Sequence, residues 1–81
     1  MTVTRIRGRS TYNHEDGYRE EDFEFTLGKG SCGKEVTFLS AYANGDFLVV
    51  NQVTSDKEVK TFYYPGHRLC GRVEVTETPA N

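Results

Sequence analysis

The sequence predicts an all-β fold, a small antiparallel meander of about six strands that closes into a barrel. Short segments alternate apolar and polar residues with the period of two that a strand requires, and Gly, Asn, Asp or Pro separates them. A helix is possible over residues 13–22, but Gly17 and the lack of an apolar stripe there argue against it. Closure removes exposed strand edges, which an 81-residue chain has little other means to cover. A two-layer β-sandwich is the alternative, and residues 1–81 are expected to form one domain.

The chain begins with an expected hairpin of two strands, over residues 4–12 and 19–27. Asp16-Gly17 favours a turn between them. Folding the chain about residues 14–17 gives a register that suits both faces of the hairpin. On one face Ile6 lies opposite Phe25 and Gly8 opposite Phe23; on the other Arg7 lies opposite Glu24 and Arg9 opposite Asp22. Arg5, Arg7 and Arg9 then either form cross-strand ion pairs or serve as a phosphate-binding stripe.

A second hairpin is expected over residues 36–53. Asn44-Gly45 is the preferred two-residue loop of a type I′ hairpin, in which both loop residues adopt positive φ. The resulting register opposes Tyr42 with Phe47, Ala41 with Leu48 and Leu39 with Val50.

This second hairpin is apolar on both faces. One face carries Val36, Phe38, Tyr42, Phe47, Val49 and Val53, and the other carries Leu39, Ala41, Leu48 and Val50. A strand pair with one face in water normally alternates apolar and polar residues. The second face is therefore either covered by the last strand or the chain ends, or it is an open contact surface.

The remaining strands follow turn signals. "TSDKE" leads into a strand over "VKTFYY", Pro65-Gly66 makes the next turn, and "RLCGRVEVTE" over residues 68–77 forms the last strand. We expect the tail after residue 77 to be frayed.

Composition excludes several classes of protein. The net charge is −2, from 10 Lys and Arg against 12 Asp and Glu, which matches neither a nucleic-acid-binding domain nor a DNA mimic. No segment approaches the ~18–20 apolar residues of a membrane span, and the N-terminus has no hydrophobic signal segment. Two cysteines without an export signal indicate free thiols in a reducing compartment. We expect a soluble, cytoplasmic protein with no membrane partner.

Residues 28–34, "GKGSCGK", have the glycine and lysine spacing of a phosphate-binding loop. Such a loop also needs a Ser or Thr after the lysine to hold magnesium, and a helix whose N-terminus faces the phosphates. Glu35 takes the hydroxyl position, and "EVTFLSAY" with its β-branched and aromatic residues predicts a strand. We therefore expect no nucleotide binding and no cofactor.

Four residues are possible zinc ligands: His14, Cys32, His67 and Cys70. Structural zinc sites are built from two closely spaced pairs, and His14 lies too far from Cys32 in the sequence to form the second pair. His67 and Cys70 lack a third group to orient a catalytic base. The sequence predicts no metal site and no enzymatic activity.

Residues 15–24 form an acidic segment with net charge −5. Its carboxylates belong to Glu15, Asp16, Glu20, Glu21, Asp22 and Glu24, and Arg19 is the one cation among them. Such a segment is either a solvated surface or a docking site for a basic partner.

Together these features favour a non-enzymatic domain that acts through protein–protein contacts, as an adaptor, a virus-type inhibitor of a host complex or an assembly component. The predicted partner surface combines the second hairpin face with the acidic segment, and comprises Leu39, Ala41, Leu48, Val50, Glu15, Asp16, Glu20 and Glu21. The partner is another protein or a second copy of the chain in a homodimer.

The alternative function is a β-barrel that binds single-stranded nucleic acid, because aromatic residues and cations interleave around one turn. Its contact residues would be Lys60, Tyr63, Tyr64, Arg68 and Arg72.

Overall fold

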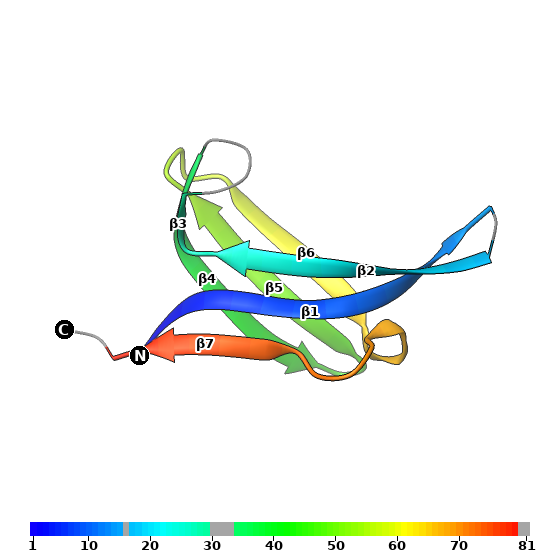
Figure 1. The fold of residues 1–81 in the computed structure, drawn as a ribbon. Helices are drawn as coiled ribbons and strands as arrows, with labels where there is room; N and C mark the ends of the chain where they lie inside the picture. The colour runs from blue at the N-terminus through cyan, green and yellow to red at the C-terminus, as the bar shows by residue number, and fades with distance from the viewer. Residues whose placement is uncertain (16, 30–33, 80–81) are drawn as a thin grey trace.

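The computed structural model describes residues 1–15, 17–29 and 34–79, and most of these lie in β-strands. The strands are β1 (Thr2–His14), β2 (Gly17–Thr26), β3 (Gly28–Lys29), β4 (Glu35–Asn44), β5 (Phe47–Thr54), β6 (Val59–Pro65) and β7 (Glu74–Thr78). A single turn of 3-10 helix, η1 (Gly66–Arg68), follows β6 (Figure 1). The predicted all-β class is confirmed. Among the described residues, no helix has the length and apolar character needed to traverse a bilayer.

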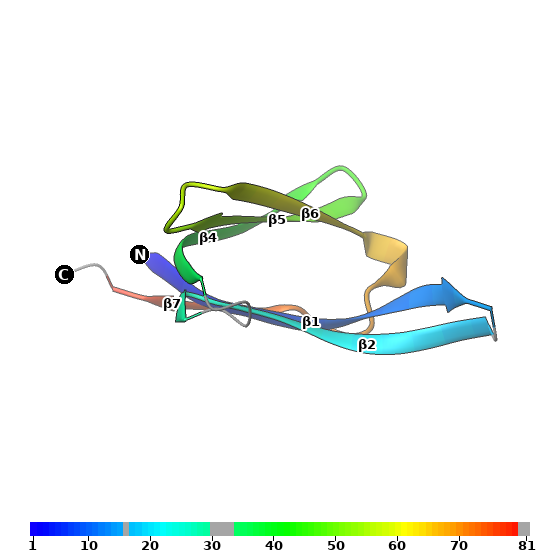
Figure 2. The same cartoon turned by 90° about the horizontal axis from the view of Figure 1, so that it is seen from above.

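The strands form two antiparallel sheets, with the orders β2-β1-β7 and β3-β4-β5-β6. Figure 2 shows the sheets as two stacked layers. The chain crosses from the first sheet to the second at Gly28, whose φ of 94° favours glycine, and returns through η1. In the described part of the chain β2 does not pair with β6, and β4 does not pair with β7. The predicted closed barrel is therefore not found, and the arrangement is that of the two-layer alternative.

The predicted register of the first hairpin is confirmed. The pairs of β1 and β2 include Ile6 with Phe25, Arg7 with Glu24, Gly8 with Phe23 and Arg9 with Asp22. The pairing continues to His14 and Gly17, so the end of this hairpin projects beyond the second sheet in both views (Figures 1 and 2). We call residues 11–20 the arm. Asp16, one of the residues predicted to contact a partner, lies outside the described residues.

The second hairpin forms, but its register differs from the predicted one. Asn44 pairs with Phe47, so Gly45-Asp46 is the two-residue loop. Gly45 has a φ of 61° and Asp46 does not have a positive φ, which is the φ pattern of a type II′ turn. The Gly66 N–H donates a 2.7 Å hydrogen bond to the Asp46 carbonyl. Gly66 lies outside the hairpin, so the turn preference of residues 44–46 could not predict this contact. Moving the turn by one residue moves each pairing by two, so the side chains from Phe38 to Val53 keep their predicted faces.

The core lies between the sheets. Ile6, Leu39 and Val50 are buried, with 0%, 2% and 0% of their surface exposed. Two aromatic contacts join the layers: Phe23 stacks on Tyr64 at a ring-centre distance of 4.3 Å, and Phe25 lies 4.9 Å from Phe62. These contacts fix which face of each sheet is interior.

The hairpin face predicted to meet a partner is part of this core. Leu39 and Val50 are buried in it, and Ala41 and Leu48 pack against it. The expectation that Leu39 and Val50 bind a partner is therefore wrong, because the first sheet covers them, whereas Ala41 and Leu48 are only partly buried. Val36 joins the same interior face, since β4 is irregular between Val36 and Phe38.

Candidate functional site

From Phe38 to Pro65, the strands of the second sheet carry no charged residue on their outer face among the residues that the structure describes. Alternation along β4, β5 and β6 places one set of side chains opposite the core. We call this set the aromatic face; its members are Phe38, Ser40, Tyr42, Asn44, Phe47, Val49, Asn51, Val53, Val59, Thr61, Tyr63 and Pro65. None of them is charged, although charged residues make up 27% of the chain.

Large apolar side chains are exposed at both ends of the aromatic face. At one end Val49 is fully buried between its cross-strand neighbours Tyr42 and Tyr63, which are themselves 49% and 63% exposed. The ring of Phe47, 46% exposed, meets Tyr63 edge to face at 6.3 Å. At the other end Phe38 is also about half exposed. The face thus presents rigid aromatic rings to solvent.

A polar row separates the two apolar ends. The Thr61 hydroxyl donates to the Asn51 side-chain carbonyl at 2.9 Å, and the Asn51 amide donates to the Ser40 hydroxyl at 3.4 Å. Because these three side chains satisfy one another across the strands, a partner surface can cover them without supplying a charge.

The outer face of the first sheet is charged and internally paired. Arg9 lies 2.8 Å from Asp22 and 3.3 Å from Glu20, and Arg5 lies 2.5 Å from Glu24. The hydrogen bond and the charge of Arg9 lower the pKa of Asp22 below its ordinary value. The cross-strand interpretation of the arginine stripe is thus supported over the phosphate-binding one.

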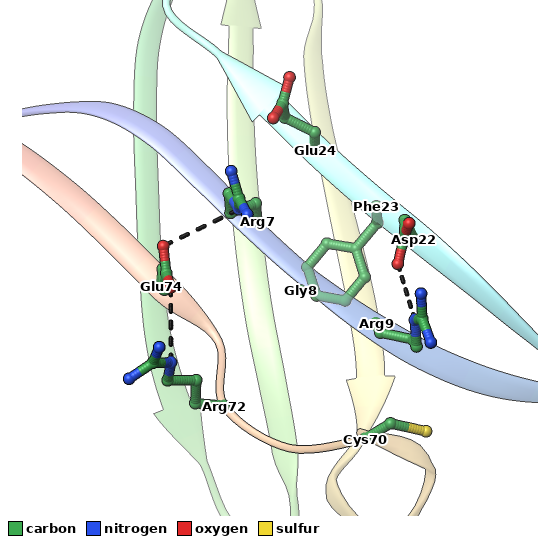
Figure 3. A pocket seen from close by; sticks show the side chains of 9 residues that line it. All are labelled: Arg7, Gly8, Arg9, Asp22, Phe23, Glu24, Cys70, Arg72 and Glu74. Atoms are coloured by element: carbon green, nitrogen blue, oxygen red, sulfur yellow. Dashed lines mark hydrogen bonds and ion pairs between the residues drawn. The ribbon is translucent and has the colours of Figure 1, made fainter.

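Glu74 completes this network around a hollow of about 510 Å³, shown in Figure 3. It lies 3.8 Å from Arg7 and 3.4 Å from Arg72, so Arg7 pairs across to β7 rather than with Glu24 opposite it. Gly8 and Phe23 also line the hollow. The cations around it already have carboxylate partners and do not form a free anion site.

The acidic segment is partly neutralised by these pairs. Glu20, Asp22 and Glu24 bond to arginines of β1, whereas Glu15 and Glu21 form no ion pair with another described residue. The pKa of Tyr64 is raised above its ordinary value, mainly by burial and to a smaller extent by the negative charge of Glu21. Of the described carboxylates of the acidic segment, the two without a described ion-pair partner are therefore Glu15 on the arm and Glu21 at its base.

The five residues expected to bind nucleic acid do not share one surface. Tyr63 lies on the aromatic face, while Tyr64 stacks on Phe23 between the sheets. The cations are elsewhere: Lys60 pairs with Glu58 at 3.4 Å, Arg72 pairs with Glu74, and the Arg68 guanidinium lies 6.0 Å from the ring centre of Tyr18.

The phosphate-loop and zinc hypotheses fall partly outside the described residues. Residues 30–33, which include Cys32, are not described, and neither is the side chain of His14. Glu35 begins β4, so the segment after the glycines is a strand, as predicted. Cys70 is a free thiol. The absence of nucleotide and metal remains a prediction.

Sequence reasoning chose the wrong face of the second hairpin, although a signal was present. Ser40 and Asn51 interrupt the face that includes Phe38 and Tyr42, whereas between Phe38 and Asn44 the opposite face of β4 carries only Leu39, Ala41 and Ala43. A polar row on one face of a doubly apolar hairpin indicates the face in water.

Comparison with known proteins gives the family. Residues 2–77 match the family of the Enterobacteria phage T3 gene 1.05 protein. The uncharacterized gene 1.05 protein of Enterobacteria phage T3 is 51% identical over 53 residues, which is 65% of this chain and 59% of that protein. No solved structure matches the chain. The chain therefore belongs to the phage gene 1.05 protein family.

Proposed function

We propose that this phage protein is a non-enzymatic binding protein whose aromatic face binds another protein. The observation that carries the proposal is a contrast between the two sheets. The outer face of the first is covered with ion pairs, whereas the aromatic face has no charged member and exposes Phe38, Tyr42, Phe47 and Tyr63. The cores of protein interfaces are depleted in charged residues and enriched in Tyr and Phe. Contiguous exposed apolar surface of this kind marks an interaction site.

The partner expected from this chemistry has an apolar surface bordered by basic residues. Tyr42, Phe47 and Tyr63 provide rigid rings that lose little conformational entropy on binding, as interface anchors do. Glu15 and Glu21, which lack a described ion-pair partner, favour a basic border through charge complementarity. An adaptor, an inhibitor of a host complex and an assembly component would all use such a contact.

Binding of single-stranded nucleic acid has less support. Stacking proteins combine aromatic rings with cations that follow the phosphates. The aromatic face holds the exposed rings but no Lys or Arg, and the cations proposed for this role lie beside carboxylates or near Tyr18. In the described part of the chain, the rings of the aromatic face are thus not brought together with these cations.

The test uses Tyr63→Lys, which places a charge at the most exposed aromatic residue of the face. Thr76→Lys is the matched control, because it adds the same charge to exposed β7. Wild-type protein and both variants are used to capture proteins from lysate of the bacterial host, and circular dichroism checks the fold of each. A specific partner should be retained by the wild type and by Thr76→Lys and lost by Tyr63→Lys.

The captured protein is then purified and its affinity measured directly. Loss of an interface anchor should cost about 2 kcal/mol or more, roughly a thirtyfold increase in Kd. If folded Tyr63→Lys binds every captured protein as the wild type does, the aromatic face is not the contact surface. Salt-sensitive binding of a single-stranded oligonucleotide by the wild type would favour the alternative function.

A further inference from the structure

Among the described residues, no strand pairs with the outer edge of β4 over most of its length. Four strands lie at or beside an open sheet edge in the described part of the chain: β2, β7, β6 and β4. β3 pairs with β4 only at Glu35 and Val36, so residues 38–44 pair with β5 on one side and with no described strand on the other. Figure 1 shows β5 and β6 lying to one side of β4.

β4 differs from the other open strands because it lacks protective residues. Charged side chains and proline discourage an edge strand from pairing with another chain. β2 carries four carboxylates and an arginine, β7 carries Glu74 and Glu77, and β6 carries Lys60 and ends at Pro65. From Val36 to Asn44, β4 contains neither a charged residue nor a proline.

Space beside this edge is also available. A hollow of about 310 Å³ lies between the start of β1 and the first half of β4, lined on one side by Met1–Val3 and on the other by residues 37–40. Exposed neighbours such as Thr37 and Ala43 leave the backbone at both ends of the edge accessible. The described residues thus do not cover it.

We propose that β4 pairs antiparallel with β4 of a second copy of this chain, about a two-fold axis at Ser40. In this register Phe38 lies opposite Tyr42 of the second copy, Leu39 opposite Ala41, and Ser40 opposite Ser40. Aromatic cross-strand pairs and facing hydroxyls stabilise antiparallel strands, and no like charges oppose each other. The same two-fold pairing at β2 would set carboxylates against carboxylates, which argues for β4 as the self-pairing edge.

This pairing goes beyond the proposed function and does not depend on it. A two-fold axis perpendicular to the sheet keeps both aromatic faces on the same side. The joined sheet would run β6-β5-β4 and then β4-β5-β6 of the second copy, so the aromatic face would double in extent. A protein partner would then meet two symmetric copies of the surface.

The first test is the solution mass of the full chain by sedimentation over a range of concentrations. The wild type should reach twice the 9.2 kDa of one chain. Ser40→Lys opposes two lysines at the axis and should raise the dimer dissociation constant by at least about tenfold. Thr61→Lys is the matched control, because Thr61 also bonds to Asn51 on the same face but lies on β6. It should dimerise like the wild type.

The second test is a cysteine crosslink, which does not require that a lysine variant fold. In a chain with Cys32→Ser and Cys70→Ser, Ser40→Cys should form an interchain disulfide on mild oxidation, because directly opposed strand residues lie within disulfide distance. Thr61→Cys should not. A wild type that stays monomeric at every concentration, a Ser40→Lys dimer of unchanged affinity, or a crosslink at residue 61 instead of residue 40 would overturn the proposal.

Discussion

At the residue scale, Gly8 shows how the absence of a Cβ lets the two layers meet. A Cβ at this position would lie 2.7 Å from the ring of Phe23 and 3.1 Å from the side chain of Val73. The space left by Gly8 is filled by the Phe23 ring, which in turn stacks on Tyr64 of the opposite sheet. The glycine is needed here for close packing, and positive φ plays no part.

Gly8→Ala should therefore destabilise the fold by about 1–3 kcal/mol, because the added methyl overpacks the contact with Phe23. The measurement is urea unfolding followed by circular dichroism. Phe23→Leu in the same chain provides the control: the double variant should lose less than the sum of the single losses, since a smaller side chain relieves the clash. An alanine variant as stable as the wild type would mean that the Phe23 ring does not occupy this space.

At the element scale, the two hairpins show which registers the sequence can specify. In the β1-β2 hairpin the turn signal, the opposed charges and the apolar positions all require one alignment, and Arg9 does face Asp22. In the β4-β5 hairpin both faces are apolar, so only the Asn44-Gly45 preference was available to set the register. Contacts from β6 and from Gly66 act on that hairpin as well, and their effect is absent from the local sequence.

The position of the second turn is testable with two substitutions of the same kind. Gly45→Val should cost roughly 1 kcal/mol or more, because a β-branched residue is poorly tolerated at a φ of 61°. Asn44→Val should be close to neutral, since Asn44 ends a strand opposite Phe47, where β-branched residues fit well. Thermal unfolding of both variants gives the comparison. Equal, large losses for both would support the type I′ register that the sequence alone predicts.

At the scale of the whole molecule, the sequence predicted strands and class but not which sheet faces meet. The hairpin of β4 and β5 is apolar on both sides, so its interior face depends on where Phe23 and Phe25 of the other sheet dock. Their partners Tyr64 and Phe62 are distant in sequence, and no local pattern pairs them. The same long-range packing decides that the molecule has one charged outer face and one uncharged outer face.

The two-layer arrangement with an open β4 edge predicts a definite pattern of amide hydrogen exchange. β5, and β1 at residues 5–7, pair with strands on both sides, so their amides should exchange most slowly. The arm should exchange early because it projects beyond the second sheet. In an edge strand, every second N–H points away from its neighbour. Within residues 37–44 we therefore expect alternating fast and slow amides at protein concentrations low enough for single chains.

Raising the protein concentration should slow the fast set in β4 and leave the edges of β2 and β6 unchanged, because only β4 is expected to gain a neighbouring strand. The measurement is amide exchange by NMR, residue by residue, at several protein concentrations. Uniformly slow exchange along β4 in single chains would mean that another part of the same chain pairs with this edge, as in the closed barrel first expected from the sequence. If protection rises with concentration on β6 instead, the chains associate through β6 and the proposed pairing at β4 is wrong.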